Sequence, residues 1–155
     1  MPRQDDIAFF HPYRVRWADV DPQSIVFNPN YFVFFDDAWN EYLRAIGLPY
    51  PDGLTTLRLD LVAVHAEASF RNSARFDEEI QTGVRVDAFG RTSLKVGFSV
   101  WRGETLLTEG RMTYVAVGSD DRRPIPLPAD IIRRISRMEI IAPSGMVSGA
   151  LPAEA

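Results

Sequence analysis

The feature that most constrains the fold is one segment, residues 28–47, whose apolar side chains would surround a helix on nearly all sides. One helical stripe consists of Tyr31, Phe35, Ala38, Tyr42 and Ala45, and a second consists of Phe32, Trp39, Leu43 and Ile46. Asn28 suits the N-cap, Pro29 suits the first helical position, and Gly47 suits the position after the last turn. A helix without a polar face must be enclosed by other elements. The segment therefore predicts a central helix.

Five strand-like segments accompany this helix, one before it and four after it. They cover residues 11–17, 62–71, 80–88, 93–101 and 105–117. The last four follow one another with short connections, which predicts antiparallel pairing of successive strands. Residues 129–138 predict a short amphipathic helix, and residues 49–60 predict a loop. The expected class is α+β: a five-stranded antiparallel sheet wrapped around a long central helix, with a short C-terminal helix.

Length and composition indicate one domain with an ordinary core. Of 155 residues, 46% are hydrophobic and 25% are charged, which is typical of a globular chain. We expect the domain to cover residues 1–141 and the tail 142–155, rich in Gly, Ser, Ala and Pro, to be disordered. One sheet and one helix leave long edges uncovered, so self-association is expected.

Several classes of function are disfavoured. The net charge of −4 argues against nucleic-acid binding, which needs a basic surface. The absence of cysteine excludes a thiolate nucleophile and a cysteine-based metal site. His11 and His65 lack a third ligand, so no metal is expected. With no apolar signal segment or membrane-length run, we expect a cytoplasmic protein without a membrane partner.

Two acids, Asp19 and Asp21, precede the predicted helix directly. A carboxylate there could act as a base or as a nucleophile. The first amides of a helix are unpaired and favour negative charge, so they could stabilise an oxyanion. Because Pro29 has no N–H, the available donors would be those of Asn28, Asn30 and Tyr31.

This stretch carries a family resemblance. Asp19-Val-Asp-Pro-Gln-Ser-Ile-Val-Phe-Asn-Pro-Asn-Tyr31 resembles the Asp-x-Asp-Pro-x-Gly-Ile-Val-x-x-x-Asn-Tyr signature of 4-hydroxybenzoyl-CoA thioesterase-like hotdog proteins. The segments 71–80 and 90–93 are similar to later motifs of that family, and the resemblance covers roughly residues 10–140. Ser24 departs from the pattern, since the family usually has Gly at that position.

The resemblance implies a hotdog fold and hydrolysis of acyl-CoA thioesters in active sites shared across a dimer, often within a tetramer. It assigns catalysis to Asp21, and polarisation of the thioester carbonyl to backbone amides near Asn28. It places Asp36 near the acyl group. Tyr31 joins the substrate-binding candidates at the helix start. The turn containing Arg91, Thr92 and Ser93 is implied to lie near the nucleotide of coenzyme A.

The resulting expectation is an acyl-CoA thioesterase for a small aryl or short acyl group, with a 4-hydroxybenzoyl-CoA-like substrate among the candidates. Coenzyme A would belong to the substrate, and no cofactor is expected. The assembly would be a homodimer or a homotetramer, a dimer of dimers. Asp21 could act as nucleophile or as general base, while Asp19 is expected to be structural. Arg71 and Arg75 are further candidates for phosphate contacts, although each alone is more typical of a surface arginine.

Two alternatives remain open. A hotdog hydratase or dehydratase acting on enoyl or hydroxyacyl thioesters would pair its Asp with a nearby His, and no His lies near Asp21 in the sequence. A module that binds acyl-CoA without cleaving it would be favoured by loss of the catalytic carboxylate, which this chain retains.

Overall fold

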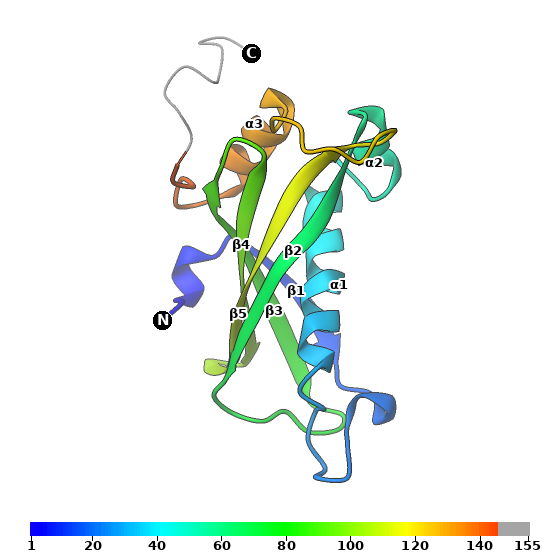
Figure 1. Cartoon of the computed structure of the whole chain (residues 1–155). Coiled ribbons are helices and arrows are strands. Elements are labelled where there is room, and N and C mark those ends of the chain that lie inside the picture. The colour runs from blue at the N-terminus through cyan, green and yellow to red at the C-terminus, as the bar shows by residue number, and fades with distance from the viewer. Residues whose placement is uncertain (146–155) are drawn as a thin grey trace.

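A long helix lies against one face of a five-stranded antiparallel sheet in the computed structural model, which describes residues 1–145 (Figure 1). The strands are β1 Phe9–Arg14, β2 Leu59–Phe70, β3 Glu79–Phe89, β4 Ser93–Arg102 and β5 Thr105–Gly118. The α-helices are α1 Asn30–Ala45, α2 Asp52–Thr56 and α3 Ala129–Met138, and two 3-10 turns cover η1 Gln4–Asp6 and η2 Trp17–Asp19. The predicted class and the predicted α1 and α3 are confirmed.

The strand order is β1-β3-β4-β5-β2, with every neighbouring pair antiparallel. The expectation that the last four strands pair in succession is wrong at one point, because β2 pairs with β5 and not with β3. Residues 71–78 connect β2 to β3 across the end of the sheet, so the strands that flank this connection lie apart. Only β3–β4 and β4–β5 are hairpins.

The core lies between α1 and the sheet. Phe35 stacks on Phe98 of β4 with ring centroids 4.8 Å apart. Gly110 of β5 makes room for this ring, because a Cβ there would lie 2.5 Å from a Phe35 ring carbon. The helix is not enclosed on all sides as predicted: Val33 is 54% exposed, and Asp36 lies on the uncovered side.

Several element boundaries differ from the expectation, and β1 and β2 begin two and three residues earlier than predicted. The first strand ends at Arg14 and not at Trp17, because the chain turns into η2 and leaves the Trp17 side chain 76% exposed. The predicted loop 49–60 contains α2, one short helix. Within residues 1–145, no helix has the length and apolarity needed to cross a membrane.

The chain after α3 returns to β3. Glu139 is buried, and its Oε1 accepts hydrogen bonds from the Tyr42 hydroxyl at 2.6 Å and from the Val86 amide at 2.9 Å. Ser144 then pairs with the end of β3, donating to the carbonyl of Asp87 and accepting from the amide of Phe89. Ser144, within the tail predicted to be disordered, is therefore paired here, and residues 146–155 lie outside the described part.

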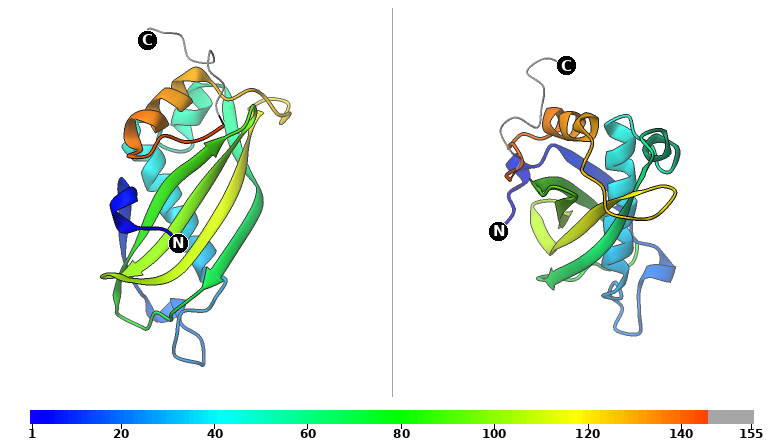
Figure 2. Two further views of the ribbon diagram at one scale, coloured as in Figure 1. Left: turned by 90° about the vertical axis from the view of Figure 1, so that its left-hand side faces the viewer. Right: turned by 45° about the horizontal axis from the view of Figure 1, so that its top comes forward.

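The two faces of the sheet carry different elements. α1 lies against one face, and the N-terminal arm with η1 crosses the other (Figure 2). The side chain of Ile7 fixes the arm in place, because it is buried against the sheet at Gly83. Among residues 1–145, one face of the sheet is thus covered by the helix and holds the core, and the outer face is crossed by the arm.

Candidate active site

The loop between η2 and α1 projects beyond one end of the sheet and carries Asp21 (Figure 1). It is closed by a bridge between Val20 and Val26 and by a hydrogen bond from the Asp21 amide to the Ile25 carbonyl. One carboxylate oxygen of Asp21, Oδ1, accepts the amide N–H of Gln23 at 2.8 Å. Its other oxygen accepts no hydrogen bond within residues 1–145. Asp21 is half-buried.

Ser24 shows why this loop usually contains glycine. Its φ of 65° is in the left-handed region, which costs an L-residue with a side chain roughly 1 kcal/mol. The Ser24 amide donates to the Asp21 carbonyl at 2.8 Å, so the turn still closes. The departure from the family pattern therefore strains the loop without opening it.

Asp19 anchors the base of the loop. Its carboxylate is 3% exposed and accepts hydrogen bonds from the Tyr13 hydroxyl at 2.6 Å and from the Arg16 amide and guanidinium at 2.8 and 3.0 Å. Burial alone would raise the pKa of Asp19, but these hydrogen bonds outweigh it and hold that pKa below its usual range. With both oxygens engaged, Asp19 is a structural acid.

The start of α1 has fewer free amides than predicted. α1 begins at Asn30, and the side chain of Asn28 makes no capping hydrogen bond. The amides of Asn30 and Tyr31 donate to the carbonyls of Phe27 and Asn28 at 2.8 and 3.2 Å. Of the three candidate donors, only the Asn28 N–H bonds to no acceptor within residues 1–145. Any oxyanion role for these amides therefore falls to Asn28.

A pocket of about 110 Å³ opens beside this amide. Asn28 and Tyr31 line one side of it, and Arg71, Asn72 and Ser73 line the other. The Tyr31 side chain is buried at 2% exposure, so it forms the floor. The Arg71 guanidinium donates to Glu109 at 2.9 Å. The sequence alone did not distinguish Arg71 from an ordinary surface arginine. In the structure, Arg71 lines the same pocket as Asn28 at the helix start.

Asp36 lies nearly two turns further along α1, on the uncovered side of the helix. The Tyr114 hydroxyl of β5 points to its carboxylate at 3.5 Å, and the Tyr114 ring stacks on Trp39 with centroids 5.3 Å apart. Burial raises the pKa of Asp36, and the Tyr114 hydrogen bond offsets part of the rise. No sequence signal singles out Tyr114, which is one of several large residues in a buried strand.

The predicted nucleotide contacts do not lie near this site. Arg91, Thr92 and Ser93 form the turn between β3 and β4, at the end of the sheet beside α3, whereas the Asp21 loop lies at the other end (Figure 1). The carbonyl of Arg91 accepts from the Leu127 amide, and that of Thr92 from the Ala116 amide. Within one chain, this turn and Asn28 therefore lie at opposite ends of the sheet.

The described residues contain no cluster of three or more metal-ligating side chains. His65 lies on the sheet beside Glu67, with 3.4 Å between the ring nitrogen and the carboxylate, and both side chains are exposed. No histidine side chain is hydrogen-bonded to Asp21, whose carboxylate is contacted only by backbone. An Asp–His pair of the hydratase kind is absent from this part of the chain.

Comparison with known proteins finds a matching family and similar proteins. Residues 15–135 match the family model described as the thioesterase-like superfamily. The chain is 29% identical over 133 residues to the 4-hydroxybenzoyl-CoA thioesterase of Pseudomonas sp. strain CBS-3, covering 79% of this chain and 94% of that protein. It is 26% identical over 125 residues to the acyl-CoA thioester hydrolase YbgC of Escherichia coli O157:H7, covering 80% and 92%. The structure of Slr0204, a 1,4-dihydroxy-2-naphthoyl-CoA thioesterase from Synechocystis, shares the hotdog fold with a TM-score of 0.75 at 18% identity, covering 82% and 94%.

Proposed function

The chain belongs to the thioesterase-like superfamily, and from this membership we propose that it hydrolyses a small acyl-CoA thioester to the free acid and coenzyme A. The observation that carries the proposal is the unbonded Asn28 amide at the start of α1, in the same loop region as Asp21. The positive end of the helix and a free N–H suit the negative charge that develops on a thioester oxygen.

Asp21 supplies the attacking oxygen or activates it. Its free carboxylate oxygen could add to the thioester carbonyl, expelling the CoA thiolate and leaving a mixed anhydride that water then cleaves. Alternatively, it could take a proton from a water molecule that adds directly. Both routes break the carbon–sulfur bond and place the oxyanion at Asn28. The hydrogen bond from Gln23 orients the carboxylate in either case.

The acyl group that fits best is small and carries a polar end. Asp36 offers a carboxylate on the uncovered side of α1, and the buried Tyr114 hydroxyl and Trp39 ring lie behind it. A hydroxyaryl group such as 4-hydroxybenzoyl could hydrogen-bond to Asp36. A short aliphatic acyl group would leave that carboxylate unused.

We further propose a dimer through β2, within a homotetramer. β2 is twelve residues long and forms an edge of the sheet, and its residues from Ala63 to Glu67 are exposed. The edge has an irregularity between Ala63 and His65, and its unpaired N–H and C=O groups are a template for a second strand. A partner would also cover the open side of α1, and could bring its own Arg91, Thr92 and Ser93 toward coenzyme A. The tetramer and the cytoplasmic location stay predictions.

Replacing Asp21 by Asn tests the function directly. We expect thiol release from a panel of aryl- and aliphatic-CoA thioesters to fall by about a hundredfold or more, because the amide can neither attack nor take a proton. Asp52→Asn is the matched control, since Asp52 is exposed on α2. Full activity of a folded Asp21→Asn protein on every substrate turned over by the wild type would refute the mechanism.

The same panel separates the alternatives. A non-catalytic acyl-CoA-binding module would bind several thioesters without releasing thiol, in the wild type as in the variant. A hydratase would change the absorbance of an enoyl-CoA while the thioester remained intact. Thiol release by the wild type alone would support the thioesterase.

A further inference from the structure

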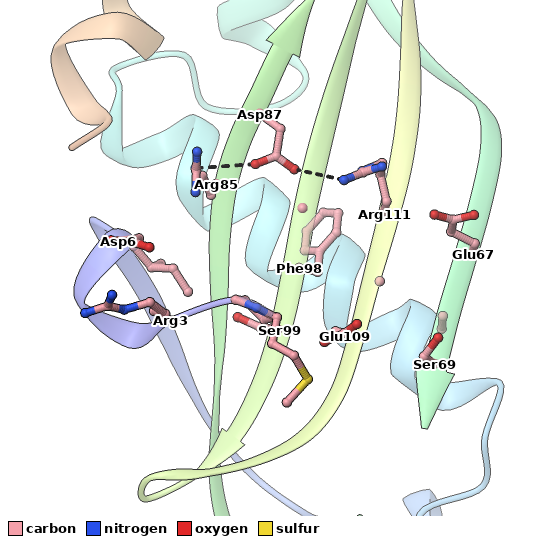
Figure 3. A pocket seen from close by; sticks show the side chains of 16 residues that line it. Arg3, Asp6, Glu67, Ser69, Arg85, Asp87, Phe98, Ser99, Glu109 and Arg111 are labelled. Carbon is pink, nitrogen blue, oxygen red and sulfur yellow. Dashed lines mark ion pairs between the residues drawn. The ribbon is translucent and has the colours of Figure 1, made fainter. Parts of the chain in front are cut away.

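The outer face of the sheet contains a second cavity, with a volume of about 590 Å³. β2, β3, β4 and β5 form its floor, and the N-terminal arm closes one side of it (Figure 3). It lies on the face opposite α1 (Figure 3), and its lining shares no residue with the pocket beside Asn28. The thioester chemistry proposed above therefore leaves this cavity unexplained.

The sheet register arranges polar groups in two rows across the floor. The first row consists of Arg85, Gly97, Arg111 and Glu67, and the second consists of Gly83, Ser99, Glu109 and Ser69. Gly97 leaves a gap between the two arginines of the first row. The Asp87 carboxylate lies over this gap, where a Cβ on residue 97 would come within 2.7 Å of it.

The charged groups of the cavity have unused hydrogen-bonding capacity. Arg85 Nε and Glu109 Oε2 are both buried and have no hydrogen-bond partner within residues 1–145. Asp87 forms ion pairs with both arginines, at 3.3 Å from Arg85 Nε and 3.8 Å from Arg111 Nη2, and neither contact is a hydrogen bond (Figure 3). Buried polar groups in proteins are nearly always paired. Arg85 Nε and Glu109 Oε2 therefore offer one donor and one acceptor to a ligand.

We propose that this cavity binds a free amino acid, with its carboxylate against Arg85 and Arg111 and its ammonium against Glu109 and Glu67. Guanidinium groups bind carboxylates through charge-assisted hydrogen bonds, and an ammonium has three donors for carboxylate oxygens. A simple anion would leave Glu109 Oε2 without a donor, since Arg71 donates to Oε1, and a simple cation would leave Arg85 Nε without a hydrogen-bond acceptor. A zwitterion offers a partner to both atoms.

The shape of the site argues against a second copy of this face as the occupant. The cavity is concave and the N-terminal arm stands at its rim (Figure 3). Two copies of this concave face would enclose an empty space between them, and Arg85 Nε and Glu109 Oε2 would stay without partners. A small molecule inside the cavity can reach both atoms.

Calorimetric titration of the full-length protein with the standard amino acids at millimolar concentration tests the inference. We expect saturable binding at one site per chain for at least one amino acid. Two probes are derived from that amino acid, one lacking its carboxylate and one lacking its ammonium. Each should bind at least about tenfold more weakly, because each loses a charge-assisted pair. Absence of binding by every amino acid, or equal binding of the probes, would overturn the proposal.

Two variants locate the site. Arg111→Gln and Glu109→Gln should each weaken binding by about tenfold or more, and the glutamine at 109 retains an acceptor for Arg71. Lys95→Gln, exposed on β4 and outside the cavity, should bind like the wild type. Unchanged amino-acid binding in both folded variants would contradict the proposed site. A change in the sedimentation mass of the variants would also contradict it, and would assign this face to contacts between copies of the chain. The probe comparison decides the question if a variant does not fold.

Discussion

The two edges of the sheet are built in opposite ways. β1 is a six-residue strand with a proline, Pro12, in its middle, and β3 residues beyond its reach are covered by Glu139 and Ser144. β2 is twice as long, contains no proline, and is exposed over much of its length. Short strands, proline and covering segments are the devices that proteins use against edge pairing. One edge is closed by the chain itself, and the other is left open.

The open edge coincides with the open side of α1. The backbone of α1 lies nearest β3 and β1, and its aromatic side chains also pack on β4, β5 and the Phe70 end of β2. The β2 residues from Ala63 to Glu67 stay exposed. Asp36 and the Asn28 pocket face this region or border β2, since Phe70 lines the pocket. If the proposed dimer through β2 completes the active site, catalysis depends on dimer formation. A closed edge has no such consequence, and its residues matter for the stability of the single chain.

The largest effect, on dimer formation, is expected when positive charges are introduced on the β2 edge. Replacing Val64 and Ala66 by lysine would place like charges opposite each other in a β2–β2 pair, which raises the dissociation constant of the dimer by about a hundredfold or more. Activity should fall with assembly while the fold persists. Analytical ultracentrifugation and thiol release measure the two quantities. His11→Lys adds a charge to the β1 edge and should change neither. A double-lysine dimer as tight as the wild type would refute the assignment of this edge.

The sequence allowed prediction of the elements better than of their arrangement. The bounds of α3 and the start of β4 agree with the periodicity, because both are local patterns. The pairing of β2 with β5 depends on contacts distant in sequence, and no local period encodes it. Glu139 gave no signal either, since a lone acid after a helix is normally exposed.

The candidate site divides in the same way. Asp21 and Asn28 are close in sequence, and the loop that holds them could be inferred from its own motif. The Arg91–Ser93 turn was grouped with them by resemblance, yet in one chain it lies at the other end of the sheet. Whether a partner reunites them depends on the β2 edge, which no local pattern describes.

The closed edge can be opened at Glu139. Replacing it by Ala leaves the Val86 amide and the Tyr42 hydroxyl without an acceptor, which should lower the free energy of unfolding by about 2 kcal/mol. Denaturant unfolding monitored by fluorescence measures it. Glu104→Ala, at an exposed turn residue, is the control. Equal stability of the two variants would show that Glu139 does not hold this edge.

The same carboxyl makes the closed edge sensitive to pH. Burial raises the pKa of Glu139 above its ordinary value of 4.5, so the folded state holds the proton more tightly than the unfolded state. This contribution is complete below 4.5 and is lost as the pH rises through the raised pKa. Glu139→Gln cannot titrate, so its stability relative to the wild type should increase across that window. Unfolding curves at several pH values, from 4 upward, measure it. Parallel profiles would contradict the assignment.

The smallest effect is expected at Pro12, and it bears on whether β1 is protected by its sequence or only by its length. A proline paired with β3 must turn its nitrogen toward the outside of the sheet, where no N–H is needed. Pro12→Val would restore one edge donor and add a β-branched residue, with a change in stability within about 0.5 kcal/mol. If the proline guards the edge, the variant should form additional, concentration-dependent oligomers in sedimentation experiments while thiol release stays unchanged. If its mass distribution matches the wild type at every concentration, the shortness of β1 suffices, and the contrast between the two edges rests on strand length alone.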